Sequence, residues 1–149
     1  ENSAIYLNNY YFYYIFSKIY IYMLKEVFVL SVIILLLDTV FLTSMGNVFG
    51  KIVYQIQNSK LELKILGAAL CYILIVFSIY YFIIQKNASL FDAFLLGILT
   101  YGIFETTNYA IFKKWPFYAI FIDTLWGGIL YSLSVYLFTW YQGKRVSFY

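Results

Sequence analysis

The stretch "ETTNYAIFKKWPFYAIFIDTLWGG", residues 105–128, places two acids, two lysines and the single proline of the chain between long apolar segments. Because the basic turn "KKWP" is short, the two apolar segments are predicted to form an antiparallel helical hairpin. Pro116 suits the first turn of the second helix, where its missing N–H removes no intrahelical hydrogen bond. Lys113, Lys114 and Trp115 are expected at the interface between membrane and water, where basic and aromatic side chains anchor spans.

The composition of the whole chain indicates that this hairpin belongs to a membrane protein. Of its 149 residues, 64% are hydrophobic and 11% are charged, whereas soluble domains carry about 25% charged residues. So few charges cannot cover a soluble surface of this size, and the sequence therefore predicts an integral membrane protein with the lipid bilayer as its surroundings. The formal net charge of +3 comes from scattered basic residues, which does not indicate a nucleic-acid partner.

Four segments are long and apolar enough to cross a membrane, since a spanning helix needs roughly 20 apolar residues. They are residues 24–45, 63–84, 89–112 and 117–141. The predicted fold is all-α: a polytopic membrane protein with four transmembrane helices in an antiparallel bundle over residues 23–142. Residues 143–149 are expected to form a polar C-terminal tail.

Two regions outside these spans allow more than one interpretation. In residues 46–60 the apolar side chains recur at helical spacing, which predicts either a short helix on the membrane surface or a partly buried loop over the end of the bundle. Residues 1–22 are rich in tyrosine and lack the features of a secretory signal. This N-terminal extension is consistent with an interfacial aromatic helix, a helical extension of the first span, or an artefact of where the chain begins.

The orientation in the membrane is not decided by basic residues. An even number of spans puts both termini on one side, with Lys18, Lys25, Lys86, Lys144 and Arg145; the other side has Lys51, Lys60, Lys64, Lys113 and Lys114. Equal numbers give no bias under the positive-inside rule. The basic C-terminal stretch "GKRVSFY" leans toward cytoplasmic termini.

Three acids within the predicted spans are expected to share one depth. Asp38 and Glu105 each lie seven residues before the end of a span, and Asp123 lies about six residues after the start of another. These span ends face the same side, so at 1.5 Å per residue all three acids lie roughly 10 Å below one interface. Ala93, Gly97, Tyr101 and Glu105 recur on one face of the third span, with Asn108 one turn further; Thr124, Gly128 and Ser132 recur on the fourth, flanked by Trp126.

An ionised carboxylate in the membrane is costly, and no basic residue shares this depth. Protonation is one remedy, with the neutral acids hydrogen-bonded to Tyr101, Thr106 or Asn108. A cation is the other, supplied by Lys113 or Lys114 or by a ligand. The sequence thus predicts a site for a proton, a cation or a polar headgroup, formed by Asp38, Tyr101, Glu105, Asn108, Asp123 and Trp126. The competing interpretation is that these groups only join the helices by hydrogen bonds.

Catalysis and metal binding are not indicated. The chain has no histidine and one cysteine, so the usual catalytic triads and His/Cys metal sites are not expected, and no cofactor is predicted. Cys71 is interpreted as a packing residue, and Asp92 as a first-turn helix residue. The alternative to a ligand-binding protein is an accessory subunit of a larger membrane complex or a homo-oligomer, favoured by the tyrosine-rich N-terminal extension.

Residues 23–142 resemble the DUF2177 family of small bacterial membrane proteins. The family pattern Tyr-Gly-x-Tyr-Asp-Leu-Thr-Asn, then Trp-Pro, then Asp-x-x-Trp-Gly is matched by Tyr101, Gly102, Thr107, Asn108, Trp115, Pro116, Asp123, Trp126 and Gly127. Asp38, Phe41 and Leu42 match a motif of the first span, and Met23 matches the family's start. Glu105 and Phe104 depart from the pattern, where the family has Asp and Tyr. The resemblance implies a four-helix membrane protein and names no substrate.

Overall fold

The computed structural model describes residues 2–144, with side chains from Tyr14 onward. Its helices are α1 (Asn2–Gln57), α2 (Ile65–Ile79), the π-helical turn η1 (Tyr80–Ile84), α3 (Leu90–Ile111) and α4 (Phe117–Tyr141). Four helical stretches of the described chain are long and apolar enough to cross a membrane. The predicted all-α fold with four spans is confirmed, and the bounds of the fourth span agree with the prediction.

The first helix is longer than the predicted first span. It continues without a break from Asn2 to Gln57, a length of roughly 84 Å at 1.5 Å per residue, against about 30 Å for the hydrocarbon core of a bilayer. Of the interpretations of the N-terminal extension, its helical continuation of the first span is what the backbone adopts. Residues 145–149 of the predicted C-terminal tail lie outside the described residues.

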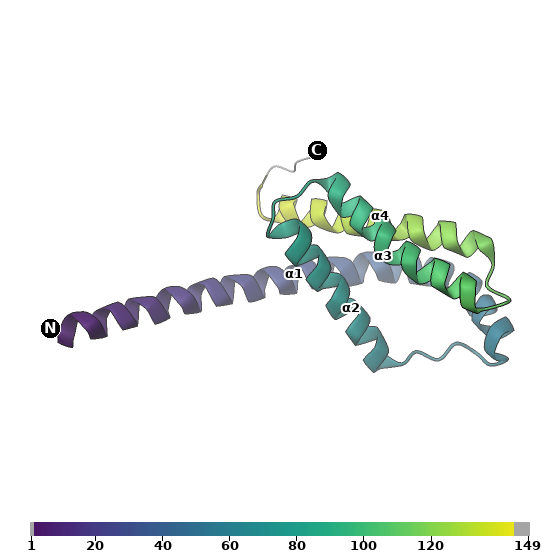
Figure 1. The fold of residues 1–149 in the computed structure, drawn as a ribbon, viewed down its shortest axis with the longest axis horizontal. Coiled ribbons are helices and arrows are strands. Elements are labelled where there is room, and N and C mark those ends of the chain that lie inside the picture. The colour runs from purple at the N-terminus through teal and green to yellow at the C-terminus, as the bar shows by residue number, and fades with distance from the viewer. Residues whose placement is uncertain (1, 145–149) are drawn as a thin grey trace.

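The segment between the first two spans is mostly helical. The final turns of α1 reach Gln57, so the prediction of a loop over residues 46–60 is wrong for most of that segment. Its apolar residues recur at helical spacing, so that Ile52, which is 2% exposed, and Val48, which is half-buried, lie on one side of the helix. Burial of this side stabilises the continuation of α1. In Figure 1 these turns lie below the turn between α3 and α4.

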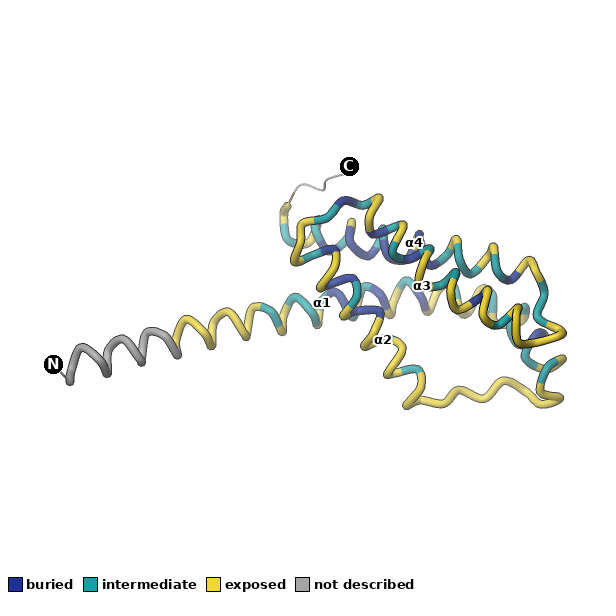
Figure 2. Tube along the Cα trace, viewed as in Figure 1, coloured by how far each residue is buried: buried dark blue, intermediate teal, exposed yellow. Residues whose placement is uncertain are grey.

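The helices pack as a hairpin, α3 with α4, against which α1 and then α2 are laid (Figure 1). The core contains Leu30, Ile34, Ile79, Leu130, Tyr131 and Phe138, each 0% exposed. Figure 2 places the buried residues where α1, α4 and the end of α2 meet, with the connection after α1 exposed. The start of α2 diverges from α3 and α4 (Figure 1).

Two helix starts have clear local causes. Ser89 caps α3 by accepting from the Asp92 backbone N–H at 3.1 Å, and the Asp92 carboxylate accepts from the Ser89 backbone N–H at 2.9 Å. This capping box satisfies two backbone donors and confirms Asp92 as a first-turn residue. Pro116 precedes α4 as its N-cap, one position earlier than the predicted first turn.

Glycines allow α3 and α4 to approach closely. A Cβ added to Gly97 would lie 2.1 Å from the Gly127 carbonyl oxygen, and one added to Gly127 would lie 2.4 Å from the Tyr101 ring. Apolar burial gives little net drive to helix association inside lipid, so such close backbone packing is a main source of stability.

Gly97→Ala is therefore expected to lower the free energy of unfolding by about 1–3 kcal/mol, because the new methyl group meets backbone that cannot move aside. Denaturant titration in detergent micelles measures this. Gly102→Ala on the same helix is the matched control, since its Cβ would only reach ordinary contact, 3.4 Å from Thr124. Equal losses for the two variants would contradict the close approach at Gly97.

Candidate functional site

Asp38 is held by two aromatic donors from two other helices. The residue as a whole is 6% exposed. The Tyr72 hydroxyl of α2 donates to Oδ2 at 2.6 Å, and the Trp126 indole N–H of α4 donates to Oδ1 at 2.8 Å. Both oxygens of Asp38 therefore have a direct partner, and the residue joins α1, α2 and α4.

The face of the Trp126 ring is also held by α1. It stacks on Phe41 with ring centroids 4.4 Å apart and planes inclined by 4°. Because Phe41 lies one turn beyond Asp38 on the same helix, α1 provides both the stacking surface and the acceptor for this indole. Trp126 thus acts here as a hydrogen-bond donor to an acid inside the bundle.

Glu105 is the most deeply buried acid of the predicted cluster, at 1% exposure. The Trp115 indole N–H donates to its Oε2 at 2.8 Å. Trp115 was predicted as an interfacial anchor, and it is half-buried with its N–H directed inward to this carboxyl. The turn between α3 and α4 is thereby fastened to the helix that precedes it.

Asp123 faces Glu105 and has an open side. Glu105 and Asp38 both lie close enough to act on Asp123 electrostatically. Two neighbouring carboxylates repel each other, and a proton on one of them relieves that repulsion. The shared site predicted for these three acids stays a prediction, and the Asp38 carboxylate is already bonded to Tyr72 and Trp126.

A cavity of about 450 Å³ lies beside Asp123. It is lined by Cys71, Leu74, Ile75, Phe77 and Ser78 of α2, Thr100, Tyr101 and Phe104 of α3, and Asp123 and Tyr131 of α4. Tyr101 packs edge-on against Tyr131, with centroids 6.3 Å apart, and the Tyr131 hydroxyl lies 3.1 Å from the Ser78 hydroxyl. The cavity occupies the space left where α2 diverges from α3 and α4.

The remaining predicted site residues are placed differently. Asn108 is half-buried and forms no side-chain hydrogen bond within the described part of the chain. Lys114 Nζ donates to the Gln55 carbonyl oxygen at 3.1 Å, and Lys113 is exposed. Neither lysine supplies the cation that was considered for the acids, because Lys114 is bonded to the end of α1.

The sequence did not predict the tyrosine donors on α2 and η1 or a second acid site. Glu26 accepts from the Tyr80 hydroxyl at 2.9 Å and from the Gln142 side-chain amide, so it joins α1, η1 and α4 at the opposite end of the bundle. Nothing in the sequence sets Tyr72 and Tyr80 apart from the other tyrosines, so only the packing of the helices identifies them as the partners of Asp38 and Glu26. In residues 14–144, no group of three or more His, Cys, Asp or Glu side chains is arranged to hold a metal ion.

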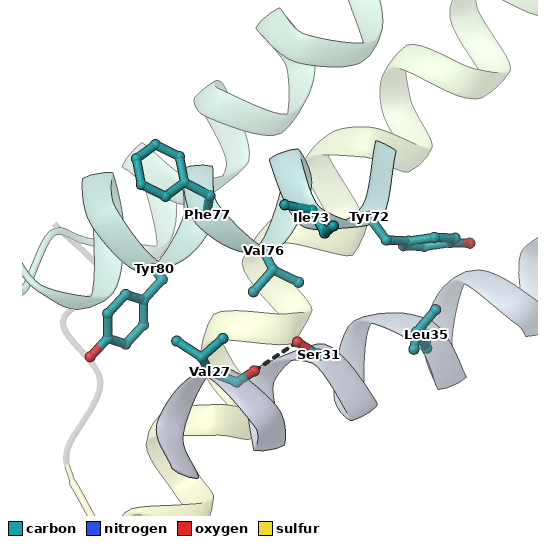
Figure 3. A pocket seen from close by; sticks show the side chains of 8 residues that line it. All are labelled: Val27, Ser31, Leu35, Tyr72, Ile73, Val76, Phe77 and Tyr80. Atoms are coloured by element: carbon teal, nitrogen blue, oxygen red, sulfur yellow. Dashed lines mark hydrogen bonds between the residues drawn. The ribbon is translucent and has the colours of Figure 1, made fainter. Parts of the chain in front are cut away.

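A neighbouring apolar groove of about 330 Å³ separates α1 from α2. Figure 3 shows that the hydroxyl groups of Tyr72 and Tyr80 point out of this groove in opposite directions. Its Ser31 hydroxyl donates to the Val27 carbonyl oxygen at 2.7 Å and is not free for a ligand. The groove therefore has no polar group to orient a bound molecule, unlike the cavity beside Asp123.

The contact between Tyr72 and Asp38 can be measured by a double-mutant cycle of Tyr72→Phe and Asp38→Asn. We expect a coupling free energy of about 0.6–1.7 kcal/mol, the range found for hydrogen bonds between helices in membranes. Tyr81→Phe is the matched control, since Tyr81 makes ring contacts on the same helical segment that Phe preserves. A cycle with no coupling would mean that the hydrogen bond contributes nothing to stability.

Comparison with known proteins agrees with the fold. Residues 22–140 match the model of the DUF2177 family, which is described as a predicted membrane protein. Neither a search of curated proteins nor a search of solved structures returned a significant match. The matched region contains the second and third spans, most of the first and fourth, and the three acids Asp38, Glu105 and Asp123. The chain is an integral membrane protein and belongs to the DUF2177 family.

Proposed function

We propose that this protein binds a small amphiphilic ligand in the cavity between α2, α3 and α4, with Asp123 holding a cationic or proton-donating group of that ligand. One observation carries the proposal. Asp123 is the single charged residue among ten that line a cavity of about 450 Å³, inside a membrane span. Ligand sites commonly combine apolar walls, a volume of about 300–1,000 Å³ and a few polar groups that fix orientation.

The walls favour a ligand with an apolar body. Leu74, Phe77 and Phe104 line the cavity and are 66%, 58% and 59% exposed on the lipid-facing surface. A molecule dissolved in the bilayer can therefore reach Asp123 from the side, between α2 and α3. A fully hydrated ion would have to lose its water against these apolar walls, which disfavours it.

The acids favour a positively charged polar group. Glu105 and Asp38 add negative potential at Asp123, and no lysine or arginine of the described chain forms an ion pair with these acids. The ring of Tyr101, which also lines the cavity, offers a surface for a cation. In the absence of ligand, we expect a proton on Glu105 or Asp123 to take the place of this charge.

Binding is proposed in preference to catalysis. The chain has no histidine, and within the described residues the lone thiol of Cys71 forms no hydrogen bond to a base that would activate it as a nucleophile. No metal or organic cofactor is invoked. The two carboxyl groups are assigned the roles of recognising a ligand and holding a proton.

Three eight-carbon probes test this proposal in lipid nanodiscs: octylammonium, octanol and octanoate. The wild-type protein is expected to gain more thermal stability from octylammonium than from the other two, measured by tryptophan fluorescence during heating. Asp123→Asn is expected to abolish that difference, because the substitution removes the charge and preserves the volume. Glu62→Gln removes an exposed acid outside the cavity and serves as the control.

Two results would contradict the proposal. One is an equal response of the wild-type protein to all three probes, which would mean that only alkyl chains are bound. The other is an octylammonium response in Asp123→Asn that equals the wild-type response. A loss in Glu62→Gln as large as that in Asp123→Asn would show a general charge effect.

A second candidate function is that of a structural or accessory subunit, with the acids joining the helices. It is favoured by the contacts of Asp38 and Glu26, which occupy those carboxylates without any ligand. The stretch from Tyr14 to Tyr22 is also exposed at every residue, and a helix that is apolar on most sides is normally covered by lipid or protein. Co-purification of other subunits, or a defined homo-oligomer in mild detergent, would support it, whereas a stable monomer would count against it.

The orientation with cytoplasmic termini remains part of this proposal. Cysteine substitutions at Lys144 and at Lys60, in a Cys71→Ser background, place single thiols at opposite ends of the bundle. Labelling of intact cells with an impermeant maleimide should modify the residue at position 60 and spare that at position 144. The reverse pattern would place the termini outside.

A further inference from the structure

A third hollow lies at the end of the bundle nearest the turn between α3 and α4, away from the Asp123 cavity. It has a volume of about 410 Å³ and is formed by the last turns of α1 and the start of the connection to α2. Its lining residues are Gly46, Asn47, Gly50, Lys51, Tyr54, Gln55, Lys60 and Leu61. None of them belongs to the Asp123 cavity, so the hollow calls for its own explanation.

The chain is folded back to bring a second lysine to this hollow. Asn58 adopts the left-handed conformation with φ 55°, and its backbone N–H donates to the Tyr54 carbonyl oxygen at 2.9 Å, which ends α1. The Gln57 side-chain amide then donates to the Lys60 carbonyl oxygen at 3.0 Å. These contacts fix residues 58–60 beside the helix that carries Lys51.

The polar groups around the hollow suit an anion. Lys51 and Lys60 each bring a positive charge, and neither forms an ion pair or side-chain hydrogen bond with another described residue. Asn47 and Tyr54 add neutral donors, whereas no Asp or Glu is among the lining residues. Gly46 and Gly50 keep the space open, since a Cβ at either position would have no heavy atom within 4 Å.

The hollow also lies at a defined depth. The contact between Lys114 Nζ and the Gln55 carbonyl oxygen, at 3.1 Å, sets the end of α1 level with the turn that joins two membrane spans. Such turns lie at the headgroup layer of a bilayer, where phosphate groups are concentrated. Lysines at this level are attracted to anionic lipids.

We infer that Lys51 and Lys60, with Asn47 and Tyr54, bind a phosphate group, in the first instance the phosphodiester of an anionic phospholipid. This site goes beyond the proposed function, because it binds the opposite charge at different residues and does not depend on Asp123. Free inorganic phosphate shares the same chemistry, and the experiment below distinguishes the two sources.

Native mass spectrometry of the protein, after exchange into phosphatidylcholine nanodiscs, can measure the binding of added phosphatidylglycerol with the same acyl chains. The double variant Lys51→Gln/Lys60→Gln is expected to bind phosphatidylglycerol roughly 10- to 30-fold more weakly, as expected for two lysines at a membrane surface. Lys144→Gln removes an exposed lysine at the opposite end of the bundle and should bind like the wild type. The double Lys→Arg variant should retain most of the affinity.

Gly50→Leu gives a second, independent test. Its side chain would fill the hollow without a clash at Cβ, so binding should fall while the net charge and the thermal stability stay near those of the wild type. An unchanged phosphatidylglycerol affinity in both Gly50→Leu and the double Lys→Gln variant would overturn the inference. An equal loss of phosphatidylglycerol affinity in Lys144→Gln would also overturn it, since this would show only that the net charge of the protein attracts the lipid.

A parallel titration with inorganic phosphate identifies the source of the anion. If inorganic phosphate binds as tightly as the lipid, and the double Lys→Gln variant loses this binding, the site exists and its ligand is a soluble anion. If only phosphatidylglycerol binds in a lysine-dependent way, the site stands with a lipid ligand. Binding of neither probe would overturn the inference.

Discussion

The structure depends on how carboxyl groups are satisfied inside a membrane without basic partners. Asp38 receives a phenol O–H and an indole N–H, Glu105 receives an indole N–H, and Glu26 receives a phenol O–H. Tyrosine and tryptophan suit this role because each pairs a large apolar ring with one polar donor. An unsatisfied carboxylate at this depth would cost several kcal/mol, so each acid also determines which helices must lie next to it.

These contacts divide the acids into two roles. Asp38 and Glu26 join α1 to α2, η1 and α4 at two levels of the bundle, and both are already satisfied by protein donors. Asp123 differs, because it faces another carboxyl group on one side and a cavity on the other. Acids that have protein donors, Asp38 and Glu26, therefore join helices. Asp123, which lacks such a donor, is the candidate binding residue.

The four membrane spans can be predicted from the sequence because apolar segments of about 20 residues match the thickness of a bilayer and satisfy their backbone hydrogen bonds as helices. Counting along these spans predicts one depth for Asp38, Glu105 and Asp123. Tyr72 could not be identified in the same way, because tyrosine is abundant in this chain and only the packing of α2 on α1 selects one of them. Likewise, the continuation of α1 to Gln57 depends on the burial of Ile52, and Trp115 points inward because Glu105 lies beneath it.

The indole N–H groups of the three tryptophans provide the most direct test of the account. Nuclear magnetic resonance of the protein in nanodiscs can follow the chemical shift and hydrogen exchange of each indole. The account predicts slow exchange for Trp115 and Trp126, and faster exchange for Trp140, which is 73% exposed near the end of α4. It also predicts that Asp38→Asn shifts the Trp126 signal alone and that Glu105→Gln shifts the Trp115 signal alone. Signals that do not respond to these substitutions would contradict the claim that indole donors hold the membrane-embedded acids.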